Sequence, residues 1–320
     1  MDPDFWVPLL LPLAAWPLAR VVTPRLPPRA ASWLLTTGCL VLAAASTAAL
    51  TLQAFAGLTV IPAIAHAGHW STQALDSMEP VNVPLAIGCG LVLSALGGAF
   101  TRTAVRYARW SRALTRELDD HSPVAGIIVL RGEEPVAFSA PGRGGRIAIS
   151  SGMLDALDPA ERDALLAHER AHLRLRHHRF LNAITLAAAL DPLLRPLCSA
   201  ARFALERWAD EAAAQHIGDR TVVAKAVAKA ALAGRAEPAF ALAATGGPVP
   251  RRVSALLAAP TRRLPAALLS ATLVLGVTGW SAQTVLDAAT DLHHDLESAQ
   301  DFTADAHHRH LPDEHDGLRR

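Results

Sequence analysis

Two histidines and a glutamate form the part of this sequence with the clearest chemical signature. His168, Glu169 and His172 lie in the string His-Glu-Arg-Ala-His, which matches the H-E-x-x-H pattern. This spacing puts both imidazoles on one face of a helix, where they can hold one zinc ion. Glu169 can then reach a metal-bound water and act as its general base. The string therefore predicts a catalytic zinc site.

A second pair of acidic residues supplies the other groups that such a site needs. A catalytic zinc ion takes a third protein ligand and keeps one open position for water. Glu206 and Asp210 share a face of a predicted helix that runs from Ala201 to about His216. We expect Glu206 to be the third ligand and Asp210 to accept a hydrogen bond from a ligating histidine. The alternative is a solvated helix face on which both carboxylates pair with Arg202 and Arg207.

The helix that carries the H-E-x-x-H string has a well-marked beginning. Asp158 can cap the helix, Pro159 suits the first helical position, and Glu161 completes a capping box. Beyond the string we interpret His177 and His178 as residues of a basic face, without a catalytic role.

Short apolar segments before this helix predict a small sheet. The segments are 126–130, 136–138 and 146–150, and the turn-forming sequence at 141–145 favours a hairpin between the last two. One strand of this hairpin could bind substrate as an added strand. Residues after 153 are predicted to be helical almost throughout.

The composition is that of a membrane protein. Hydrophobic residues make up 51% of the 320 residues and charged residues 18%, with a mean hydropathy of +0.25; soluble domains usually carry about 25% charged residues. The net charge of +1 predicts no direct nucleic-acid binding. Cys39, Cys89 and Cys198 form no C-x-x-C motif, so neither a disulfide framework nor a cysteine zinc cluster is expected.

Four apolar stretches approach the length that spans a bilayer, namely 5–22, 32–55, 81–100 and 264–282. The first contains three prolines and could instead lie on the surface. Arginines cluster after the first and third stretches and before the fourth, whereas the 56–80 loop has no Lys or Arg. Positive residues favour the cytoplasmic side. We therefore expect a multi-pass protein of the cell membrane whose N-terminus, 56–80 loop and C-terminal tail are extracytoplasmic.

The apolar insert from Phe180 to Ser199 is too polar at its centre to cross easily, because it contains Asp191 and Arg195. A crossing would also separate Glu206 from the two histidines. We therefore place the insert against or partly in the cytoplasmic face, or in the core of the catalytic domain.

These patterns predict four parts of the chain. Residues 1–104 hold three transmembrane helices, 105–262 a cytoplasmic catalytic domain, 263–283 a fourth transmembrane helix, and 284–320 an extracytoplasmic tail rich in His and Asp. The tail could bind metal, or it could be a polar solubilising segment. Its histidines are His293, His294, His307, His308, His310 and His315.

The motifs together resemble the BlaR/MecR-type membrane metallopeptidases. The resemblance covers roughly residues 100–220 and rests on the H-E-x-x-H helix, the short apolar insert, the E-x-x-A-D string at 206–210 and the segment from Ile147 to Leu154. It implies a membrane α-helical plus α+β fold: about four transmembrane helices and a mainly helical, gluzincin-like protease domain with a small β-hairpin or sheet. The antibiotic sensors of this family carry a penicillin-binding domain after the last span, and only about 38 residues follow here. We expect no beta-lactam sensing through such a domain.

The family implies regulated cleavage of a cytoplasmic or membrane protein, often a transcriptional repressor and the protease itself. Two alternatives remain open. One is a membrane quality-control peptidase similar to the HtpX and CAAX-prenyl proteases, which share both motifs but place two membrane helices between them. The other is a non-catalytic metal-sensing membrane protein, which has no need of a base at Glu169. The expected partners are a protein or peptide substrate and the lipid bilayer.

Overall fold

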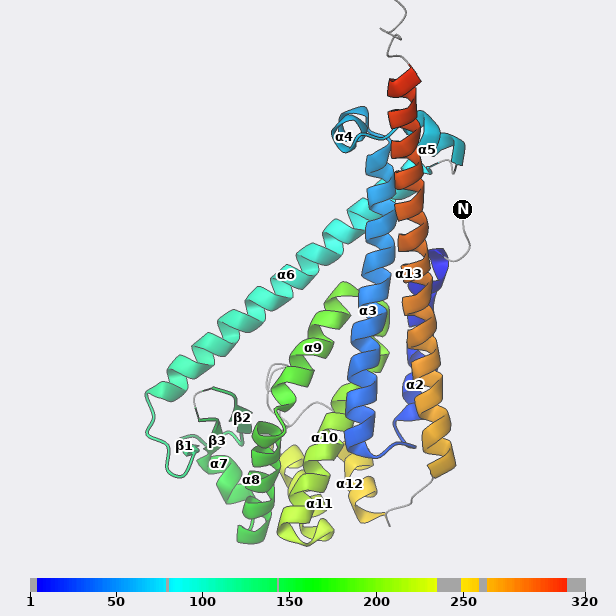
Figure 1. Ribbon diagram of the computed structural model, residues 1–320. Helices are drawn as coiled ribbons and strands as arrows, with labels where there is room; N and C mark the ends of the chain where they lie inside the picture. Colours follow the sequence, from blue (N-terminus) through cyan, green and yellow to red (C-terminus); the bar gives the residue numbers. More distant parts are fainter. Residues whose placement is uncertain (1–4, 79–80, 143, 235–248, 259–263, 310–320) are drawn as a thin grey trace, which may run out of the picture.

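The computed structural model describes residues 5–78, 81–142, 144–234, 249–258 and 264–309. These residues are mainly helical and include one small three-stranded sheet. Long helices form an upright bundle, and the sheet lies with several of the shorter helices at one end of it (Figure 1). A membrane-type helical part joined to a mixed α and β part agrees with the predicted fold class.

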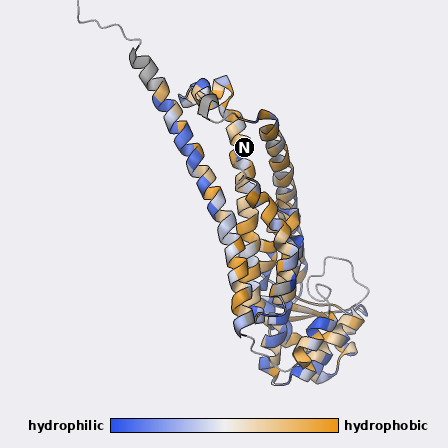
Figure 2. Cartoon of the chain, turned by 90° about the vertical axis from the view of Figure 1, so that its right-hand side faces the viewer, coloured by the Kyte–Doolittle hydropathy of each residue, from blue (hydrophilic) through white to orange (hydrophobic). Residues whose placement is uncertain are grey.

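Among the described residues, three helices are long and apolar enough to cross a membrane. They are α3 (Pro28–Thr59), α6 (Val83–Asp119) and α13 (Leu264–Arg309), of which Ala267–Phe302 is the candidate span. They contain the second, third and fourth predicted spans. Hydrophobic residues dominate the bundle, whereas the C-terminal part of α13 is hydrophilic (Figure 2).

The first predicted span has a different form. It consists of α1 (Trp6–Leu10), the 3-10 turn η2 (Leu11–Ala14) and α2 (Ala15–Val22). Its three prolines lack the backbone N–H that a continuous α-helix needs, which accounts for the interruption. Ala15 and Leu18 are buried in one core with residues of α3 and of α10 (Arg195–Ile217). Four spans are therefore not found among the described residues.

Two helices extend further than predicted. α6 joins the third span to the basic segment at 105–120, and α13 joins the fourth span to the tail. No Pro or Gly interrupts residues 280–309, and Ala, Leu, Glu and Gln there favour helix. His310 and His315 lie outside the described residues. α4 (Pro62–Gly68) and α5 (Thr72–Met78) occupy the loop at the end of the bundle away from the sheet.

The sheet contains the predicted hairpin. β2 (Ala137–Ala140) pairs antiparallel with β3 (Arg146–Ser150), and β1 (Ile127–Leu130) pairs parallel with β3, in the order β1-β3-β2. β2 is therefore an edge strand. The short helix α7 (Ser151–Ala156) connects the sheet to α8 (Pro159–Arg174).

α8 begins with the predicted capping box. Asp158 Oδ1 accepts a hydrogen bond from the Glu161 backbone N–H at 3.0 Å, and Glu161 Oε2 accepts one from the Asp158 backbone N–H at 3.0 Å. Lys229 Nζ, from α11 (Arg220–Ala233), lies 2.6 Å from the same Glu161 oxygen. The start of the helix that carries the histidines is thus fixed by both local and long-range contacts.

The apolar insert forms a helical hairpin that does not cross the bundle. α9 (His177–Leu190), the turn η3 (Pro192–Leu194) and α10 turn back along α3, and Ile184 and Leu197 are buried in the core shared with α3. At the turn, Asp191 Oδ2 accepts a hydrogen bond from Ser46 Oγ of α3 at 3.0 Å. The hairpin therefore returns the chain to the end of the molecule that holds α8.

Candidate metal centre

The imidazoles of α8 and a carboxylate of α10 converge in the interior. The Nε2 atoms of His168 and His172 are 3.0 Å apart, and each lies 3.6 Å from an oxygen of Glu206. All three residues are buried, and their donor atoms lie within 4.8 Å of one another. Donors around a tetrahedral zinc ion, at roughly 2.0–2.2 Å from it, are about 3.3 Å apart. The residues present therefore fit a zinc ion.

Small side chains allow α8 and α10 to approach closely enough for this arrangement. Ala167 and Ala171 of α8 are buried, as are Ala209 and Ala213 of α10. Larger residues at these positions would separate the helix axes. The histidines and Glu206 project from the same interface because residues four apart share a helix face.

Asp210 lies one turn beyond Glu206 and faces His168. Its Oδ1 is 3.0 Å from His168 Nδ1, the ring nitrogen that points away from His172. Arg202 and Arg207 instead contact Thr185 Oγ1 and the Thr23 carbonyl, respectively. Both carboxylates are buried, so the alternative of a solvated face paired with Arg202 and Arg207 is wrong.

Arg252 completes the cluster, although in the sequence it stands only in the basic flank before the fourth apolar stretch. It belongs to α12 (Val249–Leu257) and is 4% exposed. Its guanidinium donates to Asp210 Oδ2 at 2.8 Å and Oδ1 at 2.6 Å, and Nη1 lies 3.0 Å from Glu206 Oε2. One sequence signal could have revealed it: Arg252 shares the buried face of α12 with Leu256, four residues on.

The charges of the cluster compensate one another without a metal. Burial alone would raise the pKa of Glu206, but Arg252, His172 and His168 together outweigh it and lower that pKa to about 2. Burial would lower the pKa of His168, yet hydrogen bonding to Asp210 and Glu206 raises it to about 10. Burial lowers the pKa of His172 to about 4. Two anionic carboxylates thus face one guanidinium and one protonated imidazole.

Glu169 lies on α8 between the two histidines in sequence and is buried. Burial raises the pKa of its carboxyl group above the ordinary value. Among the described residues, its Oε2 has no hydrogen-bond partner. A cavity of about 30 Å³ borders Glu169, His168 and Ala137 of β2. It has room for one or two water molecules, since one needs about 10–15 Å³ of such volume.

His177 is not a basic-face residue, so that prediction is wrong. Its side chain is 0% exposed, and its Nδ1 lies 3.0 Å from Nδ1 of His172. The prediction assumed that the helical spacing of α8 continues as far as His177. α8 instead ends at Arg174, and α9 begins after Arg176, whose φ of 55° is left-handed. His178, the next residue, is only partly buried.

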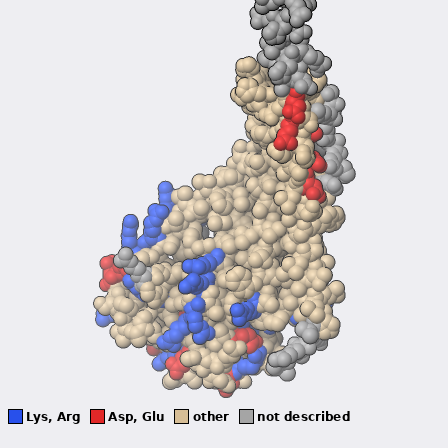
Figure 3. All heavy atoms as spheres, viewed as in Figure 1, with Lys and Arg blue, Asp and Glu red and all other residues tan. Residues whose placement is uncertain are grey.

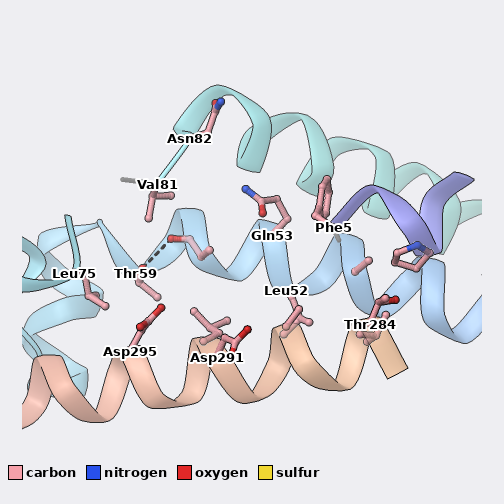
Figure 4. A pocket seen from close by; sticks show the side chains of 16 residues that line it. Phe5, Leu52, Gln53, Thr59, Leu75, Val81, Asn82, Thr284, Asp291 and Asp295 are labelled. Atoms are coloured by element: carbon pink, nitrogen blue, oxygen red, sulfur yellow. Dashed lines mark hydrogen bonds between the residues drawn. The ribbon is translucent and has the colours of Figure 1, made fainter. Parts of the chain in front are cut away.

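A larger cavity lies at the other end of the molecule and takes no part in this centre. It encloses about 180 Å³ between α3, α13 and the start of α6, and its wall includes Gln53, Asp291 and Asp295 (Figure 4). No histidine lines it in the part of the chain that the structure describes. Among the described residues, the group formed by His168, His172 and Glu206 is the one set of His, Cys, Asp and Glu side chains that could hold a metal ion.

Comparison with known families points to the same region. The model of peptidase family M48 matches residues 108–190, which contain the sheet and all of α8. No curated protein and no solved structure matches the chain. The match does not confirm the BlaR/MecR subtype. Together with the three apolar helices and the buried His168, His172 and Glu206 group, it supports a membrane metallopeptidase of the M48 type.

Proposed function

We propose that this protein is a membrane-embedded zinc endopeptidase in which Glu169 is the general base. His168, His172 and Glu206 are the proposed zinc ligands, and Asp210 orients His168. The observation that carries the proposal is the convergence of these three buried donors beside a water-sized cavity that Glu169 borders. The M48 match over α8 supports the same assignment.

A bound zinc ion would supply a water of pKa near 7 and would polarise the scissile carbonyl. Glu169 accepts the proton of the attacking water on its unpartnered Oε2 and passes it to the leaving amine. Asp210 Oδ1 lies 3.0 Å from His168 Nδ1 and would accept its proton, which leaves the Nε2 lone pair for the metal. Arg252 keeps the Glu206 carboxylate ionised and oriented.

The edge strand β2 favours an extended peptide as substrate. Among the described strands, β2 pairs only with β3, so its other backbone edge can pair with an added strand. Ala137 of β2 also lines the cavity beside Glu169. A peptide bound along β2 would therefore pass the proposed zinc site in the middle of its length, as an endopeptidase requires.

The charge distribution supports a cytoplasmic active site. Basic side chains gather over the end of the molecule that holds the centre, whereas acidic side chains line the outer part of α13 (Figure 3). Since positive residues favour the cytoplasm, reporter fusions at residues 120 and 175 should report cytoplasm, and fusions at 68 and 300 the outside. A fusion at 240, which lies outside the described residues, should also be cytoplasmic. An extracytoplasmic signal at 175 would contradict the topology.

We further propose that cleavage is regulatory, with a transcriptional repressor and the protease itself as candidate substrates. Quality control of membrane proteins is the alternative, and a closed metal-sensing site is disfavoured by the base beside the cavity. Quantitative proteomics of cells expressing wild type or Glu169→Ala should distinguish them. Regulatory cleavage predicts that one or a few intact proteins accumulate in the variant, and quality control predicts many. If no protein accumulates, the proposed peptidase function is contradicted.

A further inference from the structure

We infer that His177 is a positioning residue that holds His172 in the orientation and tautomer needed for metal binding. The inference rests on the proposed zinc site. It starts from one contact: Nδ1 of His177 lies 3.0 Å from Nδ1 of His172, on the side of that ring opposite the metal donors. The two rings are nearly perpendicular, at 87°, so they do not stack, and the short contact between them is the one that joins their Nδ1 atoms.

The contact between two ring nitrogens requires one proton, and the position of that proton decides whether His172 can bind a metal. If His172 carries the proton on Nδ1, its Nε2 has a free lone pair facing His168 and Glu206. If His177 carries the proton on Nδ1 instead, neutral His172 must be protonated on Nε2 and cannot be a ligand. Zinc binding therefore selects the arrangement in which His172 donates and His177 accepts.

The position of His177 is fixed by packing. The left-handed Arg176 directly precedes His177, the first residue of α9. The centroid of the His177 ring lies 5.0 Å from that of the Trp208 indole and 6.4 Å from that of the Phe180 ring. Its Nε2 has no hydrogen-bond partner among the described residues. Burying an unmatched nitrogen is unfavourable, and an apolar side chain would fill the space without that cost. The gain that a histidine brings here is its contact with His172.

The two ligating histidines thus have different acceptors. His168 faces the carboxylate of Asp210, whereas His172 faces a neutral imidazole. The site already contains three buried carboxyl groups, those of Glu169, Glu206 and Asp210. A neutral acceptor orients His172 without adding a further buried negative charge, whose desolvation would be costly.

The test compares substitutions that keep or remove the acceptor. Asparagine places its Oδ1 close to the position of the histidine Nδ1, so His177→Asn keeps an acceptor. His177→Leu has a similar size without one, and His177→Phe keeps a ring against Trp208 without one. The matched control is His178→Leu, at the adjacent histidine. Zinc affinity is measured on the full-length detergent-solubilised chains by competition with a chelator, and the visible spectrum is recorded with Co²⁺ in place of zinc.

We expect His177→Leu and His177→Phe to weaken zinc binding by about 10–100-fold, the usual effect of losing such an outer partner, and to alter the Co²⁺ spectrum. His177→Asn should recover most of the affinity and the wild-type spectrum, and His178→Leu should change neither. Wild-type affinity in a folded acceptor-free variant would overturn the inference, as would an Asn variant as weak as Leu. A wild-type protein that binds no zinc would instead overturn the proposed function.

Discussion

Replacing Glu169 with alanine is expected to abolish proteolysis while about one zinc ion per chain remains bound. Glu169 is not among the proposed ligands, and its truncation leaves the donors of His168, His172 and Glu206 in place. Loss of a positioned general base lowers a rate by about 10²–10⁴-fold. The variant should also fold, because burial raises the pKa of this carboxyl group, so the charged group is not a source of stability. Zinc content and the cleavage rate of an accumulated substrate measure the two effects.

His168→Ala is the control for this experiment. It removes a donor atom, so zinc and proteolysis should be lost together. Removing the His168 imidazole also leaves Asp210 without its contact to His168 Nδ1. Cleavage by Glu169→Ala at the wild-type rate would contradict the assignment of the base, and zinc retained at wild-type affinity by His168→Ala would contradict the ligand set.

Replacing Arg252 with methionine is expected to destabilise the metal-free protein by about 3–5 kcal/mol. The substitution keeps most of the apolar volume but removes the cation that faces two buried carboxylates, Asp210 and Glu206. An unpaired charge left in the interior loses its Coulombic partner without regaining water. The measurement is the free energy of unfolding of the detergent-solubilised chain, from a denaturant titration followed by circular dichroism.

Arg251→Met provides a matched control at the neighbouring position. Arg251 is exposed, and its guanidinium lies 4.8 Å from the ring centroid of Phe203. An exposed cation over an aromatic ring contributes about 0.5–1 kcal/mol, so this variant should remain close to wild type. Equal losses of stability in the two variants would contradict the structural role of Arg252. Bound zinc should reduce the loss of unfolding free energy in Arg252→Met, because the metal ion would place a positive charge beside Glu206.

Local spacing was sufficient to select His168, His172 and Glu206, the three residues that could hold a metal ion. The i, i+4 pairs His168 with His172 and Glu206 with Asp210 each require only one regular helix, and the capping box at Asp158 also depends on neighbours in sequence. The hairpin of β2 and β3 was predictable for the same reason, because the turn residues between them are local.

Long-range contacts and helix interruptions were not predictable in this way. Arg252 reaches Asp210 across a separation of 42 residues, and its surroundings in sequence are those of a basic membrane flank. His177 faces inward because a new helix begins after the left-handed Arg176, and a left-handed arginine has no local sequence signal. The first apolar stretch was predicted from its composition, whereas its prolines determine its interrupted form.

The zinc K-edge X-ray absorption spectrum of the 320-residue protein is the most direct test of the proposed zinc site, because multiple scattering from the rings counts the imidazole ligands and a sulfur ligand lies at a longer distance. We predict two imidazoles, from His168 and His172, with the remaining ligands oxygen from Glu206 and water, at roughly 2.0–2.2 Å. His177→Leu should keep the count of two imidazoles. A third imidazole or a sulfur ligand near 2.3 Å would indicate a closed or different site and would contradict the proposed peptidase centre.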